Sequence, residues 1–187
     1  TVEIATGKIN RITSNQIAPD AMHKERQPLF SPDGKSIAYQ LNLKNAGYAY
    51  DIFVTSPSGG NGINVTAKLD RCFFRSEWSM DSKAIFVAAN DFNTVSLWMQ
   101  PVNGAAKKLN TSNMTITGAY WYNYTVGKNN AIAMIASTAQ SPQELYFMAN
   151  PESAPKQLTN FHQEIKLVQL GKVETFSWKS DQFIPNA

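Results

Sequence analysis

Short runs of apolar residues, four to six residues long, fill the sequence and are separated by turns that contain Gly, Pro, Asn and Asp. The runs are rich in β-branched and aromatic residues, a composition typical of strands in hairpins. No 12-residue window keeps the helical period of about 3.6 residues, and residues 165–170 offer at most one or two turns. The pattern therefore predicts an all-β chain.

The strand pattern repeats along the chain. Residues 30–39 (FSPDGKSIAY) align with residues 78–87 (WSMDSKAIFV), 48 positions later (78 − 30). In both, an aromatic residue and a Ser precede an Asp-centred turn, a Lys and an apolar strand. A less regular third copy covers residues 122–135. It lies 47 positions after the second copy when Ile132 is aligned with Ile85 (132 − 85). A second strand, followed by a turn and a short closing strand, recurs at residues 51–54, 96–99 and 144–147.

Four short antiparallel strands in a unit of about 40–50 residues are typical of a β-propeller blade. We predict whole blades over residues 28–66, 74–110 and 119–159, and the last two strands of another blade over residues 2–13. A β-sandwich is the alternative, but it does not require the same turn chemistry at a fixed offset. A closed ring needs about 4–8 blades, so about three and a half four-stranded blades predict a partial β-propeller cut from a larger one. Its open edges favour self-association.

Composition narrows the classes of function. The chain has 187 residues, 43% of them hydrophobic, and a net charge of +3. Lys and Arg are scattered, so we predict no nucleic-acid partner. The longest apolar runs are only a few residues, so we predict no transmembrane helix and no membrane partner. The sequence leaves the cellular compartment open.

The sequence suggests no catalytic, cofactor-binding or metal-binding residue. No Gly-x-Ser-x-Gly motif is present. His23 and His162 fall in predicted loops, lack a Ser partner in any motif, and lack the spacing of metal ligands. The single cysteine, Cys72, excludes an internal disulfide and a cysteine-cluster metal site, and we interpret it as a buried structural thiol. Asp33 and Asp81 occupy turn positions.

Aromatic residues concentrate between residues 73 and 124, where they could form a platform for a carbohydrate or peptide. Blades of a propeller pack face to face through such residues, so we favour core packing instead. The set comprises Phe73, Phe74, Trp78, Trp98, Tyr120, Trp121, Tyr122 and Tyr124.

Four segments resemble known families. Residues 30–39 closely resemble a blade motif of TolB-like propellers and of the N-terminal propellers of prolyl oligopeptidase family serine peptidases. Residues 141–147 (SPQELYF) and 157–162 (QLTNFH) resemble the last blade of an acylaminoacyl-peptidase or dipeptidyl-peptidase V type enzyme. Residues 173–181 (VETFSWKSD) resemble the strand that leads into the α/β-hydrolase domain of that family, although residues 182–185 (QFIP) depart from its Asp-Gly turn.

The resemblance implies a partial propeller over residues 1–165 and a linker over residues 166–187 toward a missing catalytic domain. The parent protein would be a serine peptidase that hydrolyses short peptides, with its Ser, Asp and His after Ala187 and no cofactor, and the propeller would gate substrate access. Some dipeptidyl peptidases hold the substrate N-terminus with a pair of Glu residues, but Glu25 and Glu77 are isolated here, so this anchoring is not carried over. The alternative is a non-enzymatic TolB-like propeller that serves as a protein-interaction platform.

Overall fold

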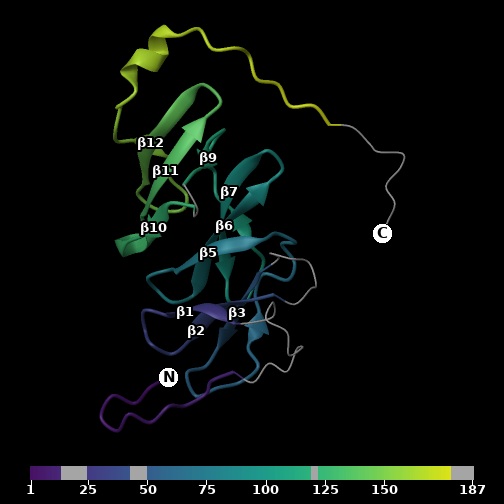
Figure 1. Cartoon of the computed structure of the whole chain (residues 1–187), viewed down its shortest axis with the longest axis vertical. Coiled ribbons are helices and arrows are strands. Elements are labelled where there is room, and N and C mark those ends of the chain that lie inside the picture. The colour runs from purple at the N-terminus through teal and green to yellow at the C-terminus, as the bar shows by residue number, and fades with distance from the viewer. Residues whose placement is uncertain (14–24, 43–49, 119–121, 178–187) are drawn as a thin grey trace.

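The computed structural model describes residues 1–13, 25–42, 50–118 and 122–177, which form three antiparallel sheets (Figure 1). In the first sheet the order is β1 (Arg26–Phe30), β2 (Ile37–Leu41), β3 (Asp51–Thr55) and β4 (Ile63–Asn64). In the second it is β5 (Phe73–Trp78), β6 (Ala84–Asp91), β7 (Thr94–Pro101) and β8 (Lys107–Lys108). In the third it is β10 (Tyr124–Val126), β11 (Ile132–Thr138), β12 (Ser141–Met148) and β13 (Lys156–Gln157), and β9 (Thr115–Ile116) also pairs with β11.

Helical structure among the described residues is limited to two short 3-10 helices, η1 (Lys128–Asn130) and η2 (Gln163–Leu167). Within these ranges no helix is long and apolar enough to cross a bilayer. The strand pair predicted for residues 2–13 is reduced to a single antiparallel bridge between Val2 and Ile9. The three sheets do not close into a ring, which confirms the prediction of an all-β, partial propeller.

The Asp-centred turn recurs with the same hydrogen bonds. Ser31 Oγ donates to Asp33 Oδ1 at 2.6 Å, and 48 residues on, Ser79 Oγ donates to Asp81 Oδ1 at 2.6 Å. Each aspartate also accepts the backbone N–H of the Lys two residues later, at 3.0 and 3.2 Å. The hydrogen bonds from Ser31 and Ser79 lower the pKa of these two carboxyl groups. Both aspartates are therefore engaged within their own turns.

Gly34 gives a first test of this turn. Its φ of +70° lies in the left-handed region, and a Cβ there would meet no atom within 4 Å. Gly34→Ala is therefore expected to lower the free energy of unfolding by about 1 kcal/mol through backbone conformation alone. Gly171→Ala is the matched control, since that site is equally open and lacks a left-handed φ. Urea titration of both variants makes the comparison, and equal effects would contradict the turn geometry.

The three sheets follow one another along the molecule (Figure 1). Successive sheets pack through alternate residues of their strands. In β6, Ile85 and Val87 lie in the apolar cluster shared with the first sheet, whereas Phe86 and Ala88 lie in the cluster shared with the third sheet. Since side chains alternate along a strand, β6 is apolar at successive positions because both of its faces are covered.

Aromatic residues fill these junctions, as predicted for Phe73, Trp78, Trp98 and Tyr124, which are at most 6% exposed. Trp78 Nε1 donates to the Leu29 carbonyl of the first sheet at 2.9 Å. Tyr124 Oη donates to the Phe86 carbonyl of the second sheet at 3.0 Å. Phe74 and Tyr122 meet edge to face with ring centroids 6.0 Å apart. Tyr120 and Trp121 lie outside the described residues.

Candidate functional site

The C-terminal segment crosses one end of the sheets at the tips of two hairpins. Asn93 Nδ2, between β6 and β7, donates to Thr175 Oγ1 at 2.8 Å. Gln140 Nε2, between β11 and β12, donates to the Gly171 carbonyl at 3.0 Å. We call residues 90–94 and 138–141, together with residues 168–177, the loop face. Figure 1 shows the C-terminal segment leaving the third sheet and passing over the ends of β11 and β12.

Asp91 stabilises the β6–β7 hairpin of the loop face. It is 8% exposed and forms ion pairs with Lys108 at 2.5 Å and Arg71 at 3.0 Å, and it accepts a hydrogen bond from Ser96 Oγ at 3.2 Å. The hydrogen bonds from Lys108, Arg71 and Ser96 hold the pKa of Asp91 below its usual range. Asp91 therefore carries its charge at neutral pH and ties β6 to β8 and to the segment before β5.

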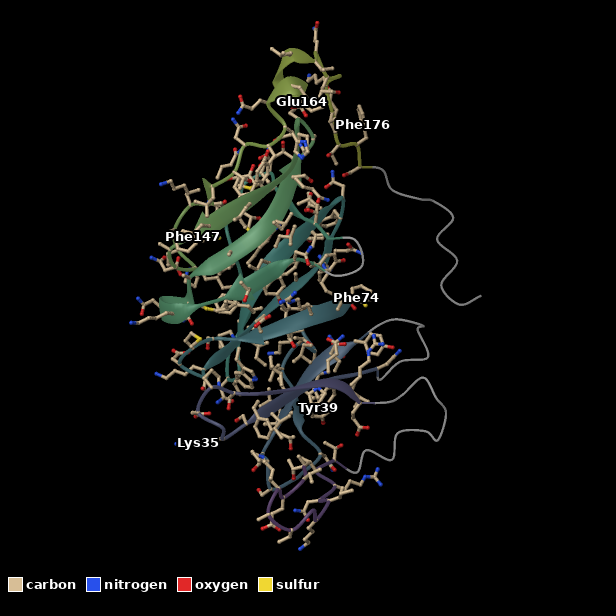
Figure 2. All side chains as sticks on the ribbon, turned by 60° about the vertical axis from the view of Figure 1, so that its left-hand side comes forward. Lys35, Tyr39, Phe74, Phe147, Glu164 and Phe176 are labelled. Carbon is tan, nitrogen blue, oxygen red and sulfur yellow. The ribbon has the colours of Figure 1, made fainter. Side chains whose placement is uncertain are left out.

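Beside this charged network the loop face presents apolar side chains. Phe92 is 95% exposed, with a positive φ of 55°, and the Arg71 guanidinium lies 5.8 Å from its ring centroid. Val173 and Phe176 of the C-terminal segment are also exposed. Figure 2 shows Phe176 on the same side of the molecule as Phe74, opposite Lys35 and Phe147. Exposed apolar residues rimmed by charge are typical of an interaction surface.

The two glutamates considered from the sequence belong to different sheets. Glu77, on β5, forms an ion pair with Arg75 at 2.7 Å. Glu25 precedes β1 and lines a hollow of about 410 Å³ at the N-terminal end. Among the described residues its buried Oε1 atom has no hydrogen-bond partner. The two carboxylates therefore lie in separate places and do not form a pair.

His162 and Cys72 are the His and Cys residues within the described ranges, and they lie in different environments. His162 is an exposed residue whose Nδ1 lies 3.7 Å from Glu164 Oε1. Cys72 is half-buried, and burial raises the pKa of its thiol. No group of three or more His, Cys, Asp or Glu in the described ranges could hold a metal ion. His23 lies outside those ranges.

Sequence reasoning missed a pair of hydrogen bonds by which a Thr hydroxyl joins the end of the closing strand to the neighbouring strand in two of the sheets. Thr66 Oγ1 accepts the Ile52 N–H at 2.9 Å and donates to Asp51 Oδ1 at 3.1 Å. In the third sheet Thr159 Oγ1 accepts the Leu145 N–H at 2.9 Å and donates to Glu144 Oε2. The signal was present in the sequence, because an acidic residue, Asp51 or Glu144, precedes each apolar run and a Thr follows each closing strand.

Comparison with known proteins supports the fold and the resemblance. No protein-family model matches the chain. A stretch of 88 residues is 32% identical to dipeptidyl-peptidase 5 of Porphyromonas gingivalis, covering 46% of this chain and only 13% of that protein.

Three solved structures are similar to this chain. Acylaminoacyl peptidase of Pyrococcus horikoshii matches 73% of this chain and 20% of its own, with a TM-score of 0.56 and 18% identity. The β-propeller domain of the Trilobed protease of Pyrococcus furiosus matches 70% of this chain and 38% of its own, with a TM-score of 0.54 and 14% identity. A TolB candidate of Agrobacterium tumefaciens matches 73% of this chain and half of its own, with a TM-score of 0.56 and 16% identity.

These likenesses define the class of the protein as a partial β-propeller. The resemblance to the propeller domains of prolyl oligopeptidase family peptidases is confirmed, and TolB-like propellers are matched as well. The chain spans half or less of the length of each of these proteins.

Proposed function

We propose that this chain is the propeller part of a serine peptidase of the prolyl oligopeptidase family that hydrolyses short peptides, and that it gates access to a catalytic domain. One observation carries the proposal: Asn93 and Gln140 hold residues 171–175 across the loop face. The segment whose sequence resembles the strand leading into a hydrolase domain therefore lies at this end of the sheets. The match to a dipeptidyl-peptidase supports the same class of parent protein.

In this proposal the chain acts sterically. The central strands β6 and β7 are almost wholly buried, so the stack is a rigid wall. A rigid wall beside an active site admits short, flexible peptides and excludes folded proteins. Acyl transfer itself needs a nucleophile, a base and oxyanion donors within hydrogen-bond reach of one another. Those groups are assigned to the catalytic domain.

Side-by-side assays test the proposal. The 187-residue chain and the product of any longer reading frame that contains it are assayed on acyl-peptide and aminoacyl chromogenic substrates, with and without a serine-reactive organophosphate. We expect turnover that the inhibitor abolishes from the longer protein and none from the short chain. Inhibitor-sensitive turnover by the short chain would contradict the proposal, as would an inactive longer protein that lacks Gly-x-Ser-x-Gly.

The gating role has its own test in the longer protein. Phe92→Asp places a charge at the exposed apolar tip of the loop face, so it is expected to loosen domain docking and to raise cleavage of large substrates relative to short peptides. Met80→Asp is the matched control, because Met80 is 48% exposed in the turn at the opposite end of β6. An unchanged ratio of large to short substrate cleavage in Phe92→Asp would argue against gating through this face.

The second candidate is a TolB-like binding propeller, favoured by the match to half of the Agrobacterium tumefaciens chain. It predicts no organophosphate-sensitive activity in any longer product. The assay above therefore separates the two functions.

A further inference from the structure

The turn before the closing strand of each sheet contains an asparagine. Asn61-Gly62 precedes β4, Asn103-Gly104 precedes β8, and Asn150-Pro151 precedes β13. Asn-Gly suits such turns because Gly accepts a positive φ, which is +71° at Gly62 and +145° at Gly104. In the same dipeptide the asparagine side chain is the least shielded from the next backbone nitrogen, because Gly has no Cβ.

The reaction open to an Asn-Gly pair is loss of the side-chain amide. The backbone nitrogen that follows the asparagine gives its proton to hydroxide and bonds to Cγ, the Cγ–Nδ2 bond breaks, and ammonia leaves after taking a proton from water. Water then opens the resulting five-membered imide at either carbonyl, which gives aspartate or isoaspartate. Because this route needs a backbone N–H after the asparagine, Pro151 blocks it at Asn150.

Tyr39 holds the Asn61-Gly62 pair in place. Its Oη donates to the Asn61 carbonyl at 3.1 Å, and a Cβ on Gly62 would lie only 2.5 Å from the same oxygen. Tyr39 is itself 3% exposed and packs on Phe53, with ring centroids 5.6 Å apart. The backbone rotation that brings the Gly62 nitrogen to Asn61 Cγ therefore has to break a hydrogen bond and displace a buried ring.

The Asn103-Gly104 pair lies in a less restrained turn. Both residues are exposed, and within the described parts of the chain neither the Asn103 side chain nor the Gly104 N–H makes a hydrogen bond. A Cβ on Gly104 would meet Pro101 at the ordinary contact distance of 3.5 Å. The attacking nitrogen and its target carbon can therefore approach each other without breaking a contact of this kind.

We propose that Asn103 is a modification site that converts spontaneously to aspartate and isoaspartate, whereas Tyr39 protects Asn61 and Pro151 blocks the reaction at Asn150. The three equivalent turns of the repeat thus have three different fates. The inference is independent of the peptidase proposal, since it concerns the edge of the second sheet and not the loop face.

The conversion changes the contacts of a buried amide. Gln100 is 3% exposed, and its Nε2 donates to the Pro101 carbonyl at 2.7 Å and to the Gly104 carbonyl at 3.0 Å. Isoaspartate at position 103 lengthens the main chain by a carbon atom and adds a carboxylate, so the Gly104 carbonyl is displaced from Gln100. We therefore expect faster amide exchange in β8, the edge strand that follows this turn.

Peptide mapping by mass spectrometry, after incubation of the full chain at mildly alkaline pH, tests the site. We expect the Asn103 peptide to gain the mass of deamidation about tenfold faster than the Asn61 peptide, the factor in rate that a hydrogen bond worth about 1.4 kcal/mol represents. In denaturant the two rates should become similar, because both pairs are then Asn-Gly in an unfolded chain. Equal rates in the folded chain, or an unchanged difference in denaturant, would overturn the proposal.

Tyr39→Phe tests the protection of Asn61, because it removes only the hydroxyl that holds the Asn61 carbonyl. It is expected to raise the rate at Asn61 toward that at Asn103 and to leave Asn103 unchanged. Asn103→Gln should abolish most of the isoaspartate formed by the folded chain, since the longer side chain must close a larger ring. Asn61→Gln is its matched control and should retain that isoaspartate. Circular dichroism checks that each variant folds. A folded Tyr39→Phe chain with no faster conversion at Asn61, or isoaspartate undiminished in Asn103→Gln, would overturn the proposal.

Discussion

Phe86→Ala is expected to lower the free energy of unfolding by about 3–5 kcal/mol, the usual cost of emptying a phenylalanine site in a packed core. Phe86 is fully buried on β6, in the cluster that joins the second and third sheets. The cost is large because Phe86 lies inside a close-packed cluster between two sheets, which can relax only partly into the cavity. A loss of this size is a large part of the stability of about 5–15 kcal/mol found for whole domains.

Phe92→Ala is the control for this change, since it removes the same side chain six residues along the chain from a site that is 95% exposed. It is expected to stay within about 0.5 kcal/mol of the wild type. Guanidinium titration followed by tryptophan fluorescence measures both variants. Equal losses for Phe86→Ala and Phe92→Ala would show that the second and third sheets do not pack as described.

The ion pairs and hydrogen bond of Asp91 are expected to make the free energy of unfolding depend on pH in the acid range. Lys108, Arg71 and Ser96 lower the pKa of Asp91 in the folded chain. The stability that Asp91 contributes is therefore fully present above its unfolded pKa of about 3.9, and it is lost as the pH falls through the lower folded pKa. Asp33 and Asp81 shift in the same direction and add to the effect. Stability should therefore fall as the pH is lowered from about 5 toward 2.

At pH 7, Asp91→Asn is expected to cost about 2 kcal/mol, because it removes a buried carboxylate that accepts hydrogen bonds from two cations. The variant should also show a shallower loss of stability below pH 5. Glu152→Gln is the control, since the Lys107–Glu152 pair is exposed on both sides and is expected to contribute no more than about 1 kcal/mol. If the free energy of unfolding of Asp91→Asn falls as steeply with acid as that of the wild type, Asp91 is not the source of the pH dependence.

The sequence predicted the sheets well because their signals are local. The Asp turns at residues 33 and 81 fix where β1 turns into β2 and β5 into β6, and the repeat offset places the third copy at β10 and β11. The buried apolar strand at residues 84–89 follows from contact on both faces. The turns and the alternation within a strand each lie within about ten residues of chain, where turn chemistry and side-chain alternation decide the structure.

The loop face could not be predicted in the same way, because its parts come from distant segments. Asp91 meets Arg71 and Lys108 only after the sheet has formed, and Asn93 reaches Thr175 across 82 residues. No local pattern marks such pairs. The N-terminal hairpin was predicted as two strands, but residues 2–13 have no inner strands beside them in the described chain, and only one bridge remains. Residues 178–181 of the hydrolase-like segment lie outside the described residues, so that part of the resemblance stays a prediction, as does the division at residue 165.

The chain is a stack of blades in which residues one repeat apart touch. Nuclear magnetic resonance of the Trp78 indole N–H tests it most directly, because that proton is donated to the Leu29 carbonyl of the neighbouring sheet, 49 residues away. We expect slow exchange of this proton with solvent and nuclear Overhauser contacts from the Trp78 ring to Leu29 and Ala38. Fast exchange, at the rate of an exposed indole, with no contact between the two sheets would contradict it.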